Sequence, residues 1–330
     1  MFHARTLIRG ATFATAIALG AVFAGQSAKA DDLNVRFSWK LKGEYGFFYL
    51  GKAKEIYKNA GISLNLGEGA GAQAALGALI QGQEDAVVLP GIFAISAIQK
   101  GMPVKIVALY QPAAPIVLIS HPENPVTKPK DLEGKTIASS VGETGTSYLG
   151  AFCEINKIDC SKINKVQMDS QSRVPQFVQN KVDVVSAYLT NDLPILEAKM
   201  GIKYPELDMR EYGLSIPGLA VVASNEGIEK KAALLRNFLA ANAKAIEMTR
   251  ADPAAATAAL QAVWNPSPSD KVVEQQIEAT SASIQSPSGK PIGWIEESAV
   301  THALKLISDV DNVGALKPAS TFYTNELLTQ

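Results

Sequence analysis

The sequence predicts an α/β protein made of two similar lobes, each with a parallel or mixed sheet flanked by helices, joined by a hinge around a central cleft. Two observations predict this class. Short β-branched runs alternate with longer helical patterns from Leu33 onward, which is typical of parallel strands joined by crossover helices, and the alternation is interrupted once and then repeated. The 330 residues, 47% of them hydrophobic, are also enough for two cores.

The first 30 residues precede this alternation and have the three parts of a secretory signal peptide. A basic start is followed by a small and apolar run over 11–25 and by Ala28-Lys29-Ala30. We therefore expect cleavage after Ala30 and export of the mature chain. The alternative is a membrane anchor, but the run is about 15 residues long, whereas a spanning helix needs about 20.

The residues after the leader predict the first lobe. Its helices are expected to end at Gly61, Gly82 and Gly101, because glycine adopts the left-handed conformation of a helix end without steric cost. In chain order we expect strand 34–38, helix 47–59, strand 62–66, helix 70–81, strand 86–89, helix 92–99 and strand 104–109.

The proline-containing segment 111–115 interrupts this order, so we expect the run 116–120 to cross into a second lobe as a hinge strand. Lobe II is then expected over 116–216, and the apolar run 219–223 is expected to cross back. Lobe I would be discontinuous, over 31–115 and 217–330, with helices 229–249 and 253–263 covering it. Within lobe II we expect strand 135–138, a glycine-containing loop 139–147, helix 148–156, strand 165–168, a helix ending at Gln179 and a strand from 183.

One internal similarity supports two equivalent lobes. The segment 79–87 and the segment 177–185 have the same order of apolar pair, glutamine, turn residue and aspartate. The turn residues are Gly82 and Asn180, the two types that best tolerate a left-handed helix end. Each segment therefore predicts a helix end, a turn and a buried strand.

Export permits a disulfide between Cys153 and Cys160, the two cysteines of the chain. Seven residues apart on one continuous helix they would be too distant, so a bond requires the helix to end between them, near Ile158-Asp159. The alternative is two reduced, half-buried thiols. Neither reading makes them catalytic.

Several chemistries lack their residues. The near-neutral chain, with 31 basic and 32 acidic residues, is not expected to bind nucleic acid. The mature chain has only His121 and His302, far apart, and no cluster with metal-ligand spacing, so we expect no metal and no catalytic residue. The segment 69–74 matches a dinucleotide fingerprint, but it follows the second strand, and glycines that allow a tight turn into a helix explain it better.

A ligand cleft is expected where the carboxyl ends of the strands of both lobes meet. In lobe I the candidates are aromatic and acidic residues after strand ends, and the rings can stack on a planar ligand: Trp39, Glu44, Tyr45 and Tyr110. In lobe II the free N–H groups and hydroxyls of a helix start are expected to hold a carboxylate, sulfonate or phosphate, with two more residues after a later strand: Gly142, Thr144, Gly145, Thr146, Tyr188 and Asn191. The alternative for Thr144, Thr146 or Ser147 is a simple N-cap.

The order of these motifs resembles a known family. The residues that carry the likeness are Trp39 with 45–49, Ala60-Gly61, Gly67, Gly69, Gly71, Gly82 with Asp85, the entry to the second lobe at 131–135, the ligand loop 142–146 and a closing helix at Tyr323-Thr324-Asn325. They are similar to the periplasmic substrate-binding proteins of ABC importers, in the branch of the nitrate, alkanesulfonate and taurine, and thiamine-pyrimidine-precursor binders.

The resemblance implies a type II-like periplasmic binding protein fold and a monomer that captures a small organic nutrient and delivers it to an inner-membrane permease, without a cofactor. Thiamine-precursor binders usually have a histidine where this chain has Tyr45, which argues against a pyrimidine. We favour an aromatic or heterocyclic nutrient over a sulfonate. Two alternatives stay open: an exported enzyme acting on a small heterocycle through the loop 69–74 or a base such as Glu44, and a periplasmic sensory protein.

Overall fold

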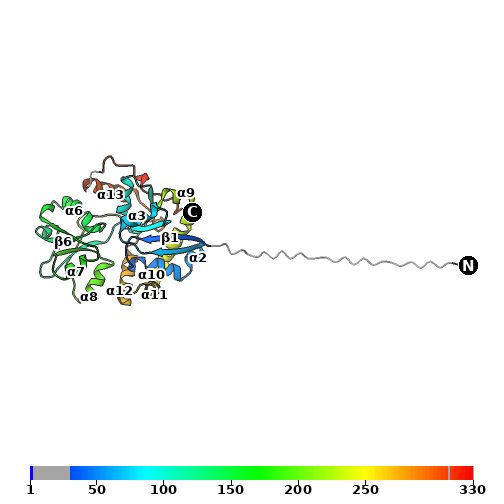
Figure 1. Cartoon of the computed structure of the whole chain (residues 1–330), viewed down its shortest axis with the longest axis horizontal. Helices are drawn as coiled ribbons and strands as arrows, with labels where there is room; N and C mark the ends of the chain where they lie inside the picture. Colours follow the sequence, from blue (N-terminus) through cyan, green and yellow to red (C-terminus); the bar gives the residue numbers. More distant parts are fainter. Residues whose placement is uncertain (3–29, 311–312, 330) are drawn as a thin grey trace.

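A computed structural model of the chain describes residues 1–2, 30–310 and 313–329. The expected leader over 1–30 lies outside the described residues, except for its first two positions and Ala30. The rest forms two lobes side by side, each built on its own five-stranded mixed sheet (Figure 1). We use lobe I for the sheet that contains β1 and lobe II for the sheet that contains β6.

The sheet of lobe I has the strand order β2-β1-β3-β10-β4. Strands β1, β2 and β3 are parallel, and β10 lies antiparallel between β3 and β4. The central strands are rich in valine, leucine and alanine because helices cover both faces of the sheet. The bounds are β1 Asp31–Phe37, β2 Ile62–Gly67, β3 Ala86–Pro90, β4 Val104–Leu109 and β10 Leu219–Ser224.

The sheet of lobe II repeats this arrangement in the order β7-β6-β8-β5-β9. Strand β6 is parallel to β7 and β8, and β5 lies antiparallel between β8 and β9. The short edge strand β9 was not expected from the sequence. The bounds are β5 Ile116–Ser120, β6 Thr136–Ser139, β7 Asn164–Gln167, β8 Val184–Tyr188 and β9 Glu206–Asp208.

The internal similarity between the two lobes is confirmed in detail. Gly82 and Asn180 both have left-handed backbone conformations, with φ of 70° and 56°. The aspartates that follow them make equivalent hydrogen bonds. The Asp85 carboxylate accepts a bond from the backbone N–H of Asn34 at 2.8 Å, and the Asp183 carboxylate accepts one from the backbone N–H of Thr136 at 2.7 Å. Each carboxylate thus ties the strand after the turn to a neighbouring parallel strand, which is β1 in lobe I and β6 in lobe II.

The runs 116–120 and 219–223 are not crossings, contrary to expectation. They are the inserted antiparallel strands β5 and β10, and β5 is buried along its whole length. The chain crosses between the lobes just before each of these strands, in the segments 111–114 and 216–219. These two segments pair with each other through backbone hydrogen bonds, such as the one from the Gly218 N–H to the backbone oxygen of Gln111 at 2.8 Å. A continuous apolar run indicates a strand covered on both faces rather than an exposed hinge.

Helices cover both faces of each sheet. The expected helix 47–59 is divided into α1 and α2, because Glu55 between them has a left-handed φ of 55°. Helices α8, α12 and α13 were not expected. Within the described residues, none of the helices has both the length and the hydropathy that a bilayer crossing requires. The bounds are α1 Gly46–Ala53, α2 Ile56–Asn59, α3 Ala72–Ile80, α4 Gly91–Gln99, α5 Thr144–Ser147, α6 Leu149–Asn156, α7 Arg173–Val178, α8 Asp192–Met200, α9 Asn225–Lys230, α10 Ala232–Ala251, α11 Pro253–Gln261, α12 Asp270–Ser283 and α13 Glu297–Val310, with 3-10 turns at Gly43–Tyr45, Pro129–Leu132, Cys160–Lys162 and Ala319–Thr321.

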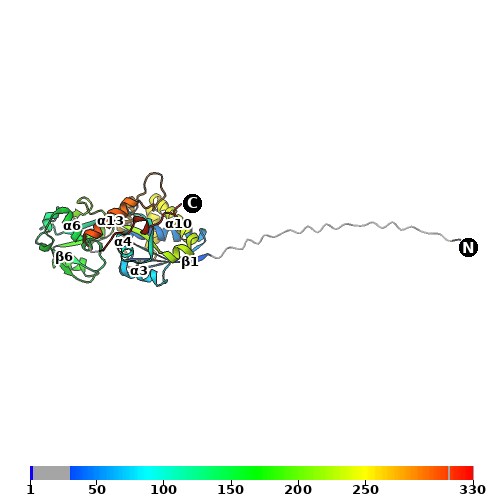
Figure 2. The ribbon, with the colours of Figure 1, turned by 90° about the horizontal axis from the view of Figure 1, so that it is seen from above.

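Helix α13 joins the two lobes. It contacts α4 of lobe I and α6 of lobe II, and in the view from above it lies next to α4 on the side of the molecule where the lobes meet (Figure 2). One apolar cluster is continuous across this contact and includes Ile95 of α4, Leu304 of α13 and Phe152 of α6. The lobes are therefore connected by buried apolar surface as well as by the two crossings.

The segment 323–325 does not form the expected closing helix. Tyr323 makes a parallel bridge with Ile106, because the edge of β4 offers free backbone groups: Ile106 donates to the oxygen of Phe322 at 2.9 Å and accepts from Thr324 at 3.0 Å. Asn325 pairs with both backbone groups of Ile295. The segment thus extends the sheet of lobe I.

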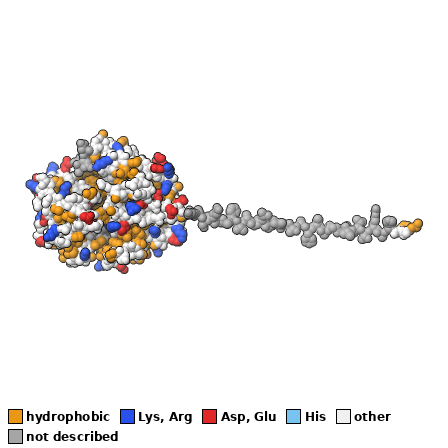
Figure 3. All heavy atoms as spheres, viewed as in Figure 1, with side chains coloured by type: hydrophobic (Ala, Val, Ile, Leu, Met, Phe, Trp, Pro, Cys, Tyr) orange, Lys and Arg blue, Asp and Glu red, His pale blue; other side chains and the backbone are white. Residues whose placement is uncertain are grey.

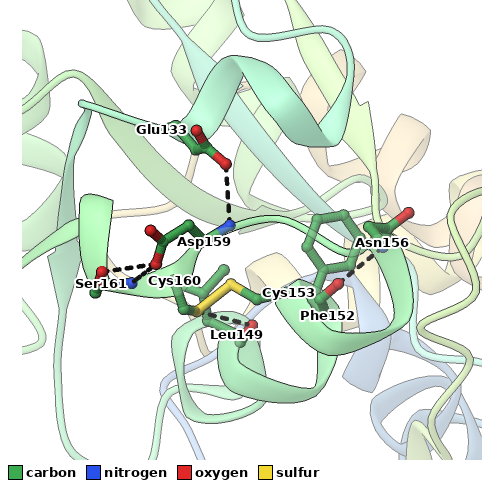
Figure 4. Close-up of a disulfide and its surroundings, with 8 residues drawn as sticks. All are labelled: Glu133, Leu149, Phe152, Cys153, Asn156, Asp159, Cys160 and Ser161. Carbon is green, nitrogen blue, oxygen red and sulfur yellow. Dashed lines mark hydrogen bonds between the residues drawn. A yellow bond between two sulfur atoms is a disulfide. The ribbon is translucent and has the colours of Figure 1, made fainter.

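Cys153 and Cys160 are bonded to each other, with Cα atoms 5.7 Å apart (Figure 4). Helix α6 ends at Asn156, and Lys157 takes the left-handed conformation, so the helix ends between the two cysteines as a bond requires. Asp159 then donates its backbone N–H to Glu133 at 2.9 Å and accepts from Ser161.

Acidic and basic side chains are interspersed on the face of the described residues seen in Figure 3, and they do not gather into one patch of a single sign there. Surface ion pairs such as Lys230 with Glu226 and Arg250 with Glu247 reflect this mixing. Exposed pairs of this kind contribute little to stability.

Candidate functional site

A cavity of about 240 Å³ lies between the two lobes. It is near the lower end of the volumes that ligand pockets have, roughly 300–1,000 Å³. Its walls are built by the segments that follow strand ends, as expected for open parallel sheets. Lobe I contributes Ser38, Trp39, Lys42, Glu44, Tyr45 and Phe93 among others. Lobe II contributes Gly142, Glu143, Thr144, Arg173, Tyr188 and Asp192 among others.

Of the ten residues expected at the cleft, the structure brings six to this cavity: Trp39, Glu44, Tyr45, Gly142, Thr144 and Tyr188. The other four lie outside its lining: Tyr110, Gly145, Thr146 and Asn191. The reason differs for each of these four positions.

Tyr110 points away from the cavity. Successive residues of an extended strand face opposite sides of the sheet, so Gln111 takes the cavity side and Tyr110 the other. The Tyr110 ring is fully buried in lobe I, packs edge-on against Phe47 and accepts a hydrogen bond from Asn242 of α10 at 2.9 Å. Tyr110 therefore packs in the core of lobe I and does not face a ligand, contrary to expectation. The next residue, Gln111, lines the cavity in its place.

The expected anion site at the start of α5 is filled by the chain itself. The Glu143 carboxylate accepts the backbone N–H groups of Gly145 and Thr146 at 2.6 and 2.9 Å, and the Thr146 hydroxyl at 2.5 Å. These are the groups that the sequence offered to an external carboxylate, sulfonate or phosphate. Glu143 is an N-cap, and it leaves Gly145 and Thr146 with no free donor for a ligand.

Arg173 completes the surroundings of this carboxylate. Its Nη2 donates to the backbone and hydroxyl oxygens of Ser186 at 2.5 and 2.8 Å and lies 3.9 Å from Glu143. The Ser186 hydroxyl in turn donates to Glu143. The Nε of Arg173 is buried and has no hydrogen-bond partner among the described residues. Arg173 and Glu143 thus form a buried pair in the wall of lobe II.

Asn191 connects the lobes next to the cavity. Its side-chain oxygen accepts the backbone N–H of Glu44 at 3.2 Å, and its amide nitrogen lies 3.4 Å from the Glu44 carboxylate. Gln276 of α12 donates to the Asn191 backbone oxygen at 2.6 Å and accepts from Gly43 at 3.0 Å. We call Gly43, Glu44, Asn191 and Gln276 the inter-lobe network; all four residues are buried.

Lys42 enters the cavity from lobe I. Its ammonium lies 3.7 Å from Glu44 and 4.9 Å from the centre of the Tyr188 ring. Burial lowers the pKa of Lys42, but the carboxylates of Glu44 and Asp192 outweigh this, and the pKa is raised. Lys42 is therefore charged at neutral pH and held between two acidic groups.

Several residues of the cavity were not predicted from the sequence, among them Lys42, Gln111 and Arg173. The rule that ligands meet the carboxyl ends of strands contained the signal for Arg173, which follows the end of β7. Asp192 lies in the segment after β8, from which Tyr188 and Asn191 were chosen as candidates.

The glycine-rich segment 69–74 has a packing role. A Cβ atom on Gly69 would lie 2.2 Å from the backbone oxygen of Phe37, so only glycine allows this loop to approach β1. Gly71 has a positive φ of 131° and precedes α3. Close approach and turning therefore account for the match to a dinucleotide fingerprint. Within the described part of the chain, no group of three or more histidine, cysteine or acidic residues is arranged to hold a metal ion.

Two lobes of the same topology, joined by two crossings around a shared cavity, define a two-lobed ligand-binding fold of the periplasmic binding protein type. The family model described as "NMT1/THI5 like" matches residues 43–256, which is more than half of the chain. The chain belongs to this family. No curated protein was found to match the sequence significantly.

Solved structures with the same fold are distant in sequence. The alkanesulfonate-binding protein SsuA from Xanthomonas axonopodis pv. citri, bound to MOPS, is 16% identical, with a TM-score of 0.67 over 88% of this chain and 98% of that one. The aliphatic sulphonate binding protein SsuA from Escherichia coli is 16% identical, with a TM-score of 0.66 over 91% and 99%. The nitrate-binding protein NrtA from Synechocystis is 12% identical, with a TM-score of 0.66 over 90% and 86%. At these identities the likeness concerns the fold.

Proposed function

We propose that the protein is the extracytoplasmic solute-binding component of an ABC importer, which captures a small organic nutrient between its lobes and delivers it to a permease in the inner membrane. The observation that carries this proposal is the cavity, to which both lobes contribute aromatic and charged side chains. The names of the structural neighbours support it, because they include sulfonate-binding and nitrate-binding proteins and a ligand-binding component of an ABC-type import system from Staphylococcus aureus.

The proposed mechanism is closure of the lobes around the ligand. Trp39, Tyr45 and Tyr188 offer ring surface, and the inter-lobe network closes beside them. A ligand favours the closed form only through its greater affinity for that form. The permease would then bind the closed protein and receive the ligand.

The proposed organisation is a leader over 1–30 that is removed after Ala30, a discontinuous lobe I over 31–115 and 217–330, and lobe II over 116–216. It is supported by the two sheets, whose strands divide along the chain in this way, while α13 contacts both lobes. The proposed location of the mature protein is the periplasm, and the proposed state is a monomer.

Among the nutrients considered, a ring-bearing compound is favoured over a sulfonate, because Glu143 already occupies the donors at the start of α5. We also propose that the ligand leaves chemically unchanged. The carboxylate that was considered as a catalytic base, Glu44, is engaged with Lys42 and Asn191, which supports a structural and binding role.

The test is recovery of the ligand. The mature protein is purified under native conditions and denatured, and the released small molecule is identified by mass spectrometry. Added back to refolded, ligand-free protein at a hundredfold excess over Kd, this compound should raise the free energy of unfolding by about 2.7 kcal/mol and thereby raise the melting temperature. It should also reduce the radius of gyration. Recovery of a chemically altered compound would instead indicate an enzyme. A protein that neither retains nor responds to any small molecule would contradict the proposed function.

A further inference from the structure

The charges of the cavity do not balance. Three carboxylates line it, from Glu44, Glu143 and Asp192, and two cationic side chains, from Lys42 and Arg173. All five charges come from residues whose backbones are fixed by helix starts or turns after strand ends. The identity of the ligand depends on which of these charges remain available once the internal contacts are counted.

The charges of lobe II that face the start of α5 are already used. Glu143 accepts two backbone N–H groups and two hydroxyls, and Arg173 donates to Ser186 beside it. The Nε of Arg173 is buried and has no hydrogen-bond partner among the described residues. The Glu143 carboxylate and the Arg173 guanidinium neutralise each other, so this pair adds no net charge to the cavity.

The remaining charges have an acidic excess. Lys42 is a single ammonium, and it faces two carboxylates, those of Glu44 and Asp192. Asp192 accepts the backbone N–H of Tyr188 at 2.9 Å, and among the described residues no ion pair includes it. One negative charge in this half of the cavity is thus without a partner of its own.

Two aromatic rings line the same cavity as these charges. Tyr188 carries the Lys42 ammonium over its ring, 4.9 Å from the centre, and Trp39 is half-buried in the cavity wall. Ring faces attract cations, and tryptophan does so most strongly. Aromatic surface next to an uncompensated carboxylate is the chemistry that recognises an organic cation rather than an anion.

We infer that the ligand of this cavity is a small organic cation that carries a ring or another apolar face, with Asp192 as its counter-charge and Trp39 as an aromatic wall. This inference rests on the proposed function and names the class of its substrate. It excludes sulfonates, carboxylates and nitrate as ligands bound through their charge.

The titration of neighbouring groups agrees with an acidic cavity. Burial raises the pKa of Tyr188, and the Glu44 carboxylate raises it further. The hydrogen bond with Thr144 lowers this pKa, and Asp192 and Glu143 each raise it by a smaller amount. Burial and Glu44 likewise raise the pKa of Tyr45. A second cation entering the cavity would relieve this excess of negative charge, whereas an anion would add to it.

The experiment compares probes that share one ring system and differ in charge. The mature protein is freed of bound small molecules by unfolding and refolding, and it is titrated with tryptamine, tryptophol and indole-3-acetate, and with benzylamine, benzyl alcohol and benzoate. Melting temperature and calorimetric affinity are measured at constant ionic strength. We expect each amine to bind at least about tenfold more tightly than its alcohol, and each carboxylate to bind more weakly than either.

Asp192→Asn is the matching variant. Its side-chain oxygen can still accept the Tyr188 backbone N–H, so the fold is kept while the charge is removed. We expect the preference for amine over alcohol to fall about tenfold in this variant. Glu123→Gln is the control, because Glu123 is an exposed carboxylate of lobe II that does not line the cavity, and it should bind all probes as the wild type does.

Three results would overturn the inference: carboxylates binding as well as amines, Asp192→Asn leaving the preference for amines unchanged, or no probe binding at millimolar concentration. None of them decides the proposed function. That proposal depends on recovery of a bound small molecule from the natively purified protein, and an anionic compound recovered there would support a binding protein while contradicting the inferred charge.

Discussion

Asn191→Ala tests whether the inter-lobe network holds the closed form. The substitution removes two contacts between the lobes: the bond from the Glu44 backbone N–H to the Asn191 side-chain oxygen at 3.2 Å, and the longer contact of its amide nitrogen with the Glu44 carboxylate at 3.4 Å. The bond from Gln276 to the Asn191 backbone oxygen is unaffected. In the open form all of these groups are free to bind water.

The magnitude follows from the number of bonds. A hydrogen bond contributes a net 0.5–1.5 kcal/mol, and more when one partner is charged, so the closed form should lose about 2 kcal/mol relative to the open form. This equals a change of about thirtyfold in the equilibrium between open and closed forms. Because the ligand binds the closed form, its apparent affinity should fall by a similar factor.

The assay combines calorimetry with the compound recovered from the purified protein and small-angle scattering with and without that compound. Asn65→Ala is the control, because Asn65 is exposed on β2 and its side chain is hydrogen-bonded to Asn34 of the same lobe. Asn191→Ala should lower the affinity and increase the radius of gyration of the ligand-free protein, and the control should do neither. If both variants had wild-type affinity and compactness, the network would not stabilise closure.

Four further outcomes follow from the described contacts. Trp39→Ala should weaken ligand binding by about 1–2 kcal/mol in calorimetry while the protein still melts cooperatively, and unchanged affinity would place the ligand elsewhere. Reduction of the bond between Cys153 and Cys160 should lower the free energy of unfolding by about 2.5 kcal/mol in chemical denaturation, and identical midpoints in both redox states would contradict this. Hydrogen bonds from two lysines and a backbone amide lower the pKa of Glu133 from its ordinary 4.5 to about 2. The carboxylate therefore favours the folded state at neutral pH, and this contribution is lost as pH falls from 4.5 through 2. Glu133→Gln should flatten that part of the plot of unfolding free energy against pH, and a plot parallel to that of the wild type would refute the assignment. N-terminal sequencing of the exported protein should begin at Asp31, and an intact leader would contradict the expected cleavage.

The strands were predictable because their apolar runs are unambiguous, whereas their order was not. The run 116–120 has the composition of a buried strand, but nothing in its sequence shows that it inserts antiparallel between β8 and β9. That position depends on contacts with residues 184–188 and 206–208, which are distant along the chain. The same holds for 219–224 and its two neighbours. Local patterns therefore predicted the elements, and long-range pairing decided the topology.

The sequence predicted part of the cavity lining, and its errors concern which way a side chain points and which residue it pairs with. Tyr110 and Gln111 are adjacent at the end of β4, and the alternation of side chains decides which one faces the ligand. Asn191 was expected to contact the ligand because it follows β8, but its side-chain oxygen accepts the backbone N–H of Glu44 from the other lobe. A contact between lobes cannot be inferred before the packing of the lobes is known.

Glu143 shows how a single residue can overturn a predicted binding site, in this case the anion site at the start of α5. A loop of glycines and hydroxyl residues before a short helix is typical of an anion site, and the donors of Gly145 and Thr146 are indeed directed at a carboxylate. That carboxylate is the side chain one residue before the helix, so the motif marks an anion that is permanently bound. The charge available to a ligand must therefore be counted after internal pairs are removed. In this cavity the count leaves Asp192, which favours a cationic ligand over one bound through an anionic group at the start of α5.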